Sequence, residues 1–464
     1  MPKCFNRSLL RPSNLKLTCL GERGGVSLPV VSTADRGADA APLANAGLEF
    51  PMHHRLITAF IAIALANSTF AEDWPRWRGP RGDGTWHGPK LPEKWPEGGL
   101  KPRWRMPIGG GYSGVTVVGQ RVFVMDRQKE PEAERVLCFD ADSGQPIWKH
   151  EYPVTYGKLD YGTGPRAAPT WHDGKLFTVG ALGECRCLDA TSGERIWSVN
   201  YLSDLNGKLQ EWGFAGSALI DGDHVIAQPG GTDGHSVAAL NRHTGKIVWQ
   251  SLSDSAGYAT PMIVTHNERR QLICWTPSHI RGLDSVTGKP FWQVPYEITY
   301  GVAIAEPIFQ EGLVLVCGYW NGSKAIRLGA HPEHAELAWE ENKFLRGLMS
   351  QPLYRNGHVY LLDKQYGLTC FELKSSTKLW DDDNQMTPRG RNPHASLVWL
   401  GDADRAIILN SEGDLILVRL NATGYHEQSR TNIIGFTWAH PAFAGSRVYA
   451  RSDTELVCVP LLPE

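Results

Sequence analysis

The chain has 464 residues, of which 42% are hydrophobic, 10% are aromatic and 21% are charged. Its 47 basic and 49 acidic residues are nearly balanced and form no basic stripe, which argues against a nucleic-acid partner. Beyond the short apolar run described next, no segment is long and apolar enough for a transmembrane helix. The length that remains is enough for one domain with a sizeable core.

The first 71 residues differ in character from the rest of the chain. Residues 1–51 are rich in Ala, Gly, Ser and Pro and show no periodicity, so we expect a non-native or disordered extension. Residues 52–71 read MHHRLITAFIAIALANSTFA, in which a weakly basic start precedes an apolar run too short to cross a bilayer. Thr69 and Ala71 are the small residues of a cleavage site. This pattern predicts a signal peptide, a periplasmic or secreted location, and Met52 as the initiator.

Processing of this signal peptide is directly testable. We expect the exported protein to begin at Glu72, because signal peptidases cleave after a small residue such as Ala71. Amino-terminal sequencing of the exported protein checks this expectation. A mature protein that retains residues before Met52 would contradict both the signal peptide and the start site.

Residues 72–103 form a segment rich in Trp and Gly that precedes the repeats. Because its tryptophans are large and apolar, we expect an extended strap packed on the following domain. These tryptophans include Trp74, Trp77 and Trp86. Stacking of a carbohydrate on them is a second interpretation.

From Trp104 onwards a short motif recurs along the chain. The motif contains a Ser-Gly or Thr-Gly turn that is followed by a tryptophan, as in CFDADSGQPIW and CLDATSGERIW. The final copy has Gln428 in the tryptophan position, and the average step is about 46 residues, a period typical of four-stranded propeller blades. The repeat tryptophans before it are Trp148, Trp197, Trp249, Trp292, Trp339 and Trp380.

The second copy explains the chemistry of the motif. Gly193 can adopt a positive φ at no steric cost, and the carboxylate of Asp189 can accept hydrogen bonds from the turn amides. Trp197 then lies on the outer strand of its unit, where its ring can be buried against the neighbouring unit.

Counting the innermost strands gives eight units, and the last unit has only three strands before the chain ends. The missing strand is available in LKPRWRMPI, around Trp104. The sequence therefore predicts an all-β fold over 104–464, an eight-bladed propeller of four-stranded blades whose last blade is closed by this N-terminal strand.

Four cysteines fall at equivalent third-strand positions of different units. As such they lie too far apart to form disulfides, and we interpret them as small buried hydrophobic residues. Cys185 shares a face with one of them, but a metal site there would need further ligands. The four equivalent residues are Cys138, Cys187, Cys370 and Cys458.

Units of the form Asp-x-x-Thr/Ser-Gly-x-x-x-Trp, eight to a ring, resemble the propeller family of the pyrroloquinoline quinone (PQQ) dehydrogenases. They equally resemble the non-catalytic PQQ-like repeat proteins, including the BamB-type outer-membrane assembly scaffold. The opening text DWPRWRGPRGDGTW is similar to a secreted bacterial subfamily of stand-alone propellers. The resemblance covers about 104–464 and implies a propeller fold. It does not imply a single function, because this fold hosts both enzymes and scaffolds.

The sequence departs from both groups of relatives. The resemblance to the dehydrogenases implies a Cys-Cys ring against the cofactor and a set of calcium ligands, but this chain has no Cys-Cys dipeptide and none of those ligands can be mapped onto it. The lipid-bearing cysteine of the scaffold relatives is also missing after Ala71. Two acidic stretches, DADSGQ at Asp140 and DDDN at 381–384, are interpreted as turns rather than calcium loops.

The first residues of the innermost strands line a propeller's central channel, so they are the candidate ligand-binding residues. They could hold an anionic or quinoid ring, with the arginine pairing with carboxylates. Glu306 is the inner-strand carboxylate that would act as base beside a calcium ion in a quinone enzyme. The alternative is that these groups hold channel waters and satisfy strand ends. The candidates are Tyr112, Arg166, Phe214, Tyr258, Glu306, Met349, His394 and His440, with Trp212 and Trp438 close by.

The leading functional prediction is a secreted, monomeric binding or scaffold protein of the cell envelope without chemistry of its own. Its partner would be an envelope protein or a small ligand in the central channel. One alternative is a PQQ- and calcium-dependent oxidoreductase acting on alcohols or sugars. A second alternative is a carbohydrate-binding module.

Overall fold

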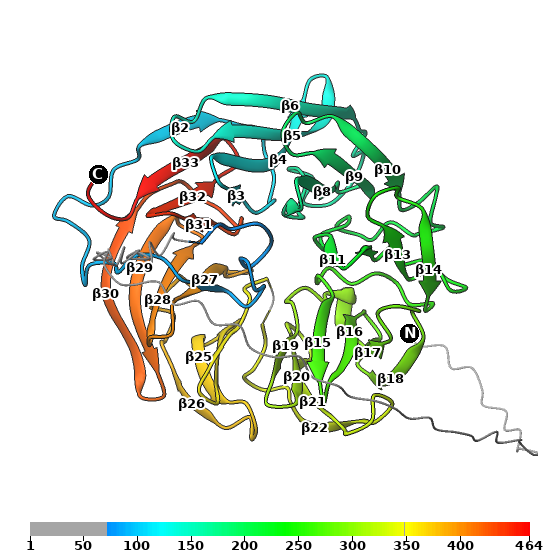
Figure 1. The fold of residues 1–464 in the computed structure, drawn as a ribbon. Helices are drawn as coiled ribbons and strands as arrows, with labels where there is room; N and C mark the ends of the chain where they lie inside the picture. Colours follow the sequence, from blue (N-terminus) through cyan, green and yellow to red (C-terminus); the bar gives the residue numbers. More distant parts are fainter. Residues whose placement is uncertain (1–71, 348) are drawn as a thin grey trace, which may run out of the picture. The chain divides into compact units, whose positions relative to one another are not determined.

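The computed structural model describes residues 72–347 and 349–464, so the predicted extension and signal peptide lie outside the described residues. In this part of the chain, eight sheets follow one another around a central channel (Figure 1). The prediction of an eight-bladed all-β propeller is confirmed. The one helix of the described residues is the short 3-10 turn η1 (Thr299–Gly301), so no helix there has the length or apolarity that a membrane crossing requires.

Blades 1 to 4 each consist of four consecutive strands, with the first strand nearest the channel (Figure 1). Blade 1 has β3 (Thr116–Val118), β4 (Arg121–Lys129), β5 (Glu132–Asp140) and β6 (Pro146–Pro153). Blade 2 has β7 (Thr170–His172), β8 (Lys175–Val179), β9 (Glu184–Asp189) and β10 (Arg195–Asn200). Blade 3 has β11 (Leu219–Asp221), β12 (His224–Ala227), β13 (Val237–Asn241) and β14 (Ile247–Ser251). Blade 4 has β15 (Met262–His266), β16 (Arg269–Trp275), β17 (His279–Leu283) and β18 (Pro290–Pro295).

Blades 5 to 7 repeat this order, and blade 8 takes its outer strand from the other end of the chain. Blade 5 has β19 (Ile308–Gln310), β20 (Leu313–Gly318), β21 (Gly322–Leu328) and β22 (Ala335–Glu341). Blade 6 has β23 (Leu353–Arg355), β24 (His358–Asp363), β25 (Gly367–Glu372) and β26 (Lys378–Asp381). Blade 7 has β27 (Ala395–Leu400), β28 (Arg405–Asn410), β29 (Asp414–Asn421) and β30 (Gly424–Asn432). Blade 8 has β31 (Ala442–Ala444), β32 (Arg447–Arg451), β33 (Glu455–Pro460) and then β2 (Trp104–Pro107).

The ring closes through β2, as the sequence predicts. This strand pairs antiparallel with β33, and Trp104 lies opposite Cys458 in the register. The Trp104 indole Nε1 donates a hydrogen bond of 3.1 Å to the carbonyl of Ala141 in blade 1. The last blade is thereby joined both to the beginning of the described chain and to its neighbour in the ring.

The repeat motif is the joint between successive blades. Main-chain amides of Thr191 and Ser192 donate to the Asp189 carboxylate at 2.8 and 2.9 Å, as predicted. Gly193 has a φ of 76°, and a Cβ there would come within 2.6 Å of the Trp148 ring of the preceding blade. The glycine is therefore required twice, for its backbone conformation and for the close approach of the ring.

The predicted equivalence of the four cysteines is confirmed. Cys138 lies opposite Trp148, and Cys187 lies opposite Trp197 in the same way. Gly282 occupies this position in blade 4, where a Cβ would come within 2.2 Å of the Trp292 ring. A small residue at this position therefore makes room for the indole. All seven cysteines among the described residues are buried and free.

The interface between blades 7 and 8 is built differently. Blade 8 has no turn between its third and fourth strands, because β33 and β2 come from opposite ends of the chain. Gln428 of β30 instead donates to Glu93 of the strap and accepts a 2.9 Å hydrogen bond from Arg405. Trp95 is buried alongside and donates to the carbonyl of Leu415 at 3.1 Å. Residues 91–95 thus cover the joint at which the repeat lacks a tryptophan.

The beginning of the strap pairs with the innermost strands of several blades. Trp74 exchanges main-chain hydrogen bonds with Val117 of blade 1, and the Pro75 carbonyl accepts a hydrogen bond from Trp171 of blade 2. The segment then reaches blade 7, where β1 (Thr85–Trp86) adds to β27 as a parallel strand. In Figure 1 this blue segment extends towards the middle of the ring beside β27. The strap therefore links blades 1, 2 and 7 beside the channel.

Candidate functional site

A cavity of about 690 Å³ lies in the channel, and we call it the cup. Its lining includes Trp77 of the strap, and most of the other lining residues come from the segments that precede the innermost strands of the blades. Nine of its lining residues are tryptophan or tyrosine: Trp77, Tyr112, Tyr161, Trp212, Tyr258, Tyr300, Tyr319, Trp320 and Trp438. A concave site of this size and aromatic content is typical of ligand binding.

Most of the channel candidates that the sequence predicts do line the cup. Phe214 does not, because it is buried edge-on against Tyr201 with ring centroids 5.2 Å apart. His440 does not line it either, because it packs between Trp74 and Trp77, at 5.9 and 5.0 Å. Those that line the cup are Tyr112, Arg166, Tyr258, His394 and Trp438, together with Trp212 and Met349.

Glu306, the candidate base, also lies outside the lining of the cup. It is 9% exposed, and its Oε2 is 3.7 Å from Nη1 of Arg78, which is itself buried. Burial raises the pKa of Glu306 to about 7, against the opposing effect of the Arg78 charge. Its main-chain amide donates to Gln351 Oε1 at 2.6 Å. The carboxyl group thus faces Arg78 of the strap at ion-pair distance, and its Oε2 makes no hydrogen bond to a described residue.

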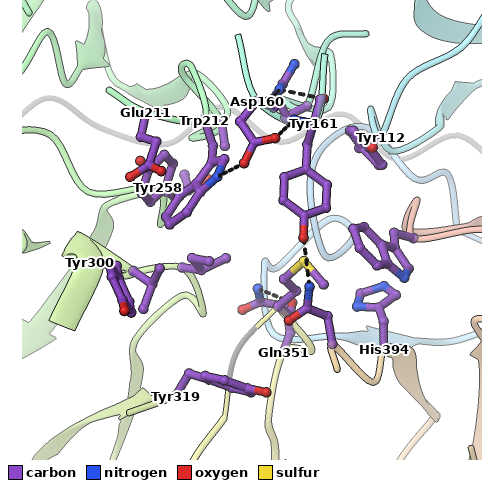
Figure 2. A pocket seen from close by; sticks show the side chains of 18 of the residues that line it. Tyr112, Asp160, Tyr161, Glu211, Trp212, Tyr258, Tyr300, Tyr319, Gln351 and His394 are labelled. Atoms are coloured by element: carbon purple, nitrogen blue, oxygen red, sulfur yellow. Dashed lines mark hydrogen bonds between the residues drawn. The ribbon is translucent and has the colours of Figure 1, made fainter. Parts of the chain in front are cut away.

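Two charged residues in the lining of the cup, Asp160 and Arg166, are engaged in the fold. Arg166 donates to the carbonyls of Gly164, Asp160 and Tyr161, the last two at 3.0 and 2.8 Å. The Asp160 carboxylate accepts from the Trp212 indole at 3.1 Å and from the Tyr161 amide at 2.9 Å (Figure 2). These charges hold the 160–166 loop and orient Trp212.

His394 presents a neutral imidazole to the cup. It is 5% exposed, and burial lowers its pKa to about 3, helped by the nearby His440. Its Nδ1 is 3.5 Å from the Ser350 hydroxyl, whereas Nε2 has no hydrogen-bond partner among the residues that the structure describes. The Nε1 of Trp438 is likewise buried without a partner in the described part of the chain. Both nitrogen atoms belong to residues that line the cup but are themselves buried, so a ligand reaches them only when a lining side chain shifts.

Tyr161 stands across the cavity. Its hydroxyl accepts a 3.1 Å hydrogen bond from Asn392, which comes from the far side of the ring (Figure 2). Its ring lies 5.8 Å from that of Trp438, and its φ of 48° is unusual for a non-glycine residue. In Figure 2 the side chain separates Trp212 and Tyr258 from Tyr112 and His394.

The exposed aromatic residues of the described chain gather at this cavity. Tyr161, Tyr300 and Trp320 line it and are 37%, 68% and 46% exposed. Phe436 is 56% exposed and packs on Trp438, with ring centroids 5.7 Å apart. A concentration of exposed aromatic surface marks a binding site.

Several of these residues were missed by sequence reasoning. Tyr161, Tyr300, Tyr319 and Trp320 lie in connections that carry no repeat motif. Their one sequence signal is an aromatic residue next to a glycine, in DYG, TYG and GYW.

The described residues do not fit a bound calcium ion with a quinone. Calcium takes six to eight oxygen ligands, yet residues 72–347 and 349–464 contain no group of three or more His, Cys, Asp or Glu placed for a metal. Asp382 of the DDDN stretch instead accepts hydrogen bonds from the amides of Leu368 and Met386, at 2.7 and 2.8 Å. Asp140 serves its repeat turn in the same way. Both acidic stretches are thus turns, as predicted.

Comparison with known proteins gives two kinds of relative. The outer membrane protein assembly factor BamB of Yersinia pestis is 23% identical over 274 residues, which are 54% of this chain and 64% of that protein. The dehydrogenase subunit of the quinone alcohol dehydrogenase of Gluconacetobacter polyoxogenes is 31% identical over 120 residues, 24% of this chain and 16% of that one. The chain thus spans less than two thirds of either relative.

Solved structures show the same fold. The quinohemoprotein alcohol dehydrogenase of Comamonas testosteroni matches with a TM-score of 0.60 at 12% identity, over 84% of this chain and 82% of that one. The family model described as outer membrane protein assembly factor BamB matches residues 132–381 and 276–462, and hence most of the propeller. This chain belongs to that family of PQQ-like propellers. Within it, the chain is similar both to BamB and to the quinoprotein dehydrogenases.

Proposed function

We propose that this chain is a non-catalytic binding protein of the cell envelope and that the cup is its binding site. The gathering of the exposed aromatic side chains at one cavity carries the proposal. The buried Arg78–Glu306 pair supports the absence of chemistry, because it keeps the candidate base out of the cavity. The name of the Yersinia relative and the signal-peptide pattern of residues 52–71 support the location.

Capture experiments with matched variants test this role. The wild-type chain, immobilised, is incubated with a bacterial envelope extract, and the retained small molecules and proteins are identified. We expect Trp212→Ala to retain at least tenfold less of the specific material, because the substitution removes a wall of the cup. Val286→Ala, in an exposed turn outside the cup, is the control and should retain as much as wild type. Equal capture by all three proteins would contradict the proposal.

A PQQ-dependent oxidoreductase is the second candidate, favoured by the match to the quinone dehydrogenase subunit. The donor set of the described residues leads us to expect no dye reduction with alcohols or sugars after incubation with PQQ and calcium. A redox dye assay measures this, with the Glu306→Gln variant alongside. Activity above background that disappears in the variant would refute the non-catalytic proposal and promote this candidate.

A further inference from the structure

The cup offers flat aromatic faces in more than one orientation. The rings of Trp212 and Tyr258 are 5.6 Å apart at an angle of 47°. At the rim, Tyr300 and Trp320 are 6.1 Å apart at 67°. Such faces pack against apolar C–H surfaces of a ligand, and the polar tips of Tyr and Trp can hydrogen-bond at the edges of the same ligand.

Neutral hydrogen-bonding groups complement these faces. Ser217 and Thr260 line the cavity, and their hydroxyl oxygens each accept a main-chain hydrogen bond of 3.0 Å, which leaves each O–H free to serve as a donor. Gln351 adds an amide group to the lining. Nε2 of His394 and Nε1 of Trp438 add two buried nitrogen atoms that pair with no group in the described chain. A buried polar atom without a partner is costly, so a ligand that reaches either nitrogen after a small shift of the side chain gains affinity.

Full charges contribute little to the interior of the cup. Asp160 and Arg166 are occupied by the loop that they hold. Glu211 and Arg391 line the cavity as exposed residues and carry opposite signs. The lining thus has no net charge and no free charge at depth, which disfavours a strongly anionic or cationic ligand.

We infer that the cup is a saccharide site, which binds a small neutral saccharide or the end of a neutral glycan chain. Saccharides combine apolar ring faces with many hydroxyl groups and no charge, and the cup offers the complement of each of these features. The inference rests on the proposed binding function and names its ligand class. The volume of about 690 Å³ lies within the range of about 300–1,000 Å³ that is typical of small-ligand sites.

The strap restricts how such a ligand enters. Trp77 lines the cup, and the neighbouring Arg78 donates to the Pro352 carbonyl at 2.9 Å while its Nη1 lies 3.7 Å from Glu306. The side chain of Tyr161 divides the remaining space (Figure 2). We therefore expect a glycan chain to enter by one of its ends.

Titration with neutral disaccharides tests the inference. Cellobiose, maltose and N,N′-diacetylchitobiose are added to the full chain, and binding is followed by tryptophan fluorescence and calorimetry. We expect saturable binding of at least one of them. Trp438→Phe should weaken it about threefold to tenfold, because it removes one hydrogen-bond donor and keeps an aromatic ring. Trp320→Ala should weaken it about tenfold, and Val286→Ala should leave it unchanged.

The dependence on pH and on chain length sharpens the test. The affinity should stay constant from pH 5 to 8, because the pKa of His394 is lowered to about 3 by burial and the imidazole stays neutral over this range. Longer oligosaccharides that bind with a stoichiometry of one protein per chain end would identify a glycan end as the ligand. Binding restricted to disaccharides would identify a free saccharide. Either result supports the saccharide site.

Other outcomes would overturn the saccharide inference. They also show whether the proposed binding function fails with it. If no neutral saccharide binds at millimolar concentration while Trp212→Ala still abolishes capture from the extract, the ligand class is wrong and the binding role stands. If a saccharide binds equally well to Trp320→Ala and Trp438→Phe, the cup is not the saccharide site. If substitutions in the cup change neither the binding of saccharides nor the capture of extract components, both proposals fail.

Discussion

Replacing Trp104 by alanine should lower the free energy of unfolding by about 3–5 kcal/mol, the usual loss for truncating a buried aromatic side chain. Trp104 is 8% exposed, and a Cβ at Gly144 of blade 1 would come within 2.7 Å of its ring. The substitution thus leaves a cavity at the joint that closes the ring. Urea denaturation followed by circular dichroism measures the loss.

The matched control is Trp320→Ala, which removes a ring of the same size from a position that is 46% exposed. It should shift the denaturation midpoint little, because few contacts are lost there. Deletion of residues 100–108 goes further, since it removes β2 and exposes the edge of β33, so that aggregation is expected. An unchanged midpoint for Trp104→Ala would show that blade 8 does not depend on this strand.

Replacing Arg78 by methionine should cost about 3–5 kcal/mol, and the cost should grow with pH. Without the guanidinium group, the buried carboxyl of Glu306 loses its partner. Burial already raises the pKa of Glu306 in the folded protein to about 7, above its ordinary value of 4.5, so the folded state holds this proton more tightly than the unfolded state does. This group therefore lowers stability as the pH rises from about 4.5 to 7.

In Arg78→Met the pKa of Glu306 should rise further, because the positive charge that opposes the effect of burial is gone. The variant should then lose stability up to a higher pH than wild type. Thermal unfolding from pH 5 to 9 measures this. The double variant Arg78→Met, Glu306→Leu should recover much of the loss and show no such dependence.

Arg81→Met is the control for the Arg78 substitution, because Arg81 pairs with Glu72 in a largely exposed ion pair. An exposed pair contributes about 0–1 kcal/mol. Equal losses for the two arginines, or a loss in Arg78→Met that stays constant with pH, would contradict the role assigned to the buried pair.

The fold could be predicted in detail because each repeat contains the residues that pack it against the neighbouring blade. Asp189, Gly193 and Trp197 act locally, so their spacing repeats wherever a blade repeats. The pairing of Trp104 with Cys458 followed from counting strands, since a ring cannot leave one blade with three. The replacement of a repeat tryptophan by Gln428 was visible in the sequence, but its reason was not, because the covering residues around Trp95 lie far away in the chain.

The site was predicted only in part, because the propeller motif does not encode it. Tyr112 and Tyr258 were found since they stand where innermost strands begin. Phe214 stands at a comparable place, but its ring packs against Tyr201 in the hydrophobic core. Tyr161 lies in a connection of irregular length, and its position depends on contacts with Asn392 and Trp438 from distant blades. Residues placed by such contacts leave no periodic trace.

The closing strand also dictates when the molecule can finish folding. Arg103, just before β2, reaches Glu464 across a sequence separation of 361 residues, and β1 needs β27 in the same way. The parts of the domain that the ribosome delivers first are therefore among the last to find their places. Contacts of such long range slow folding, and the intermediates expose unpaired strand edges. A chain of this design depends on protection of its leading end until its final blade has emerged.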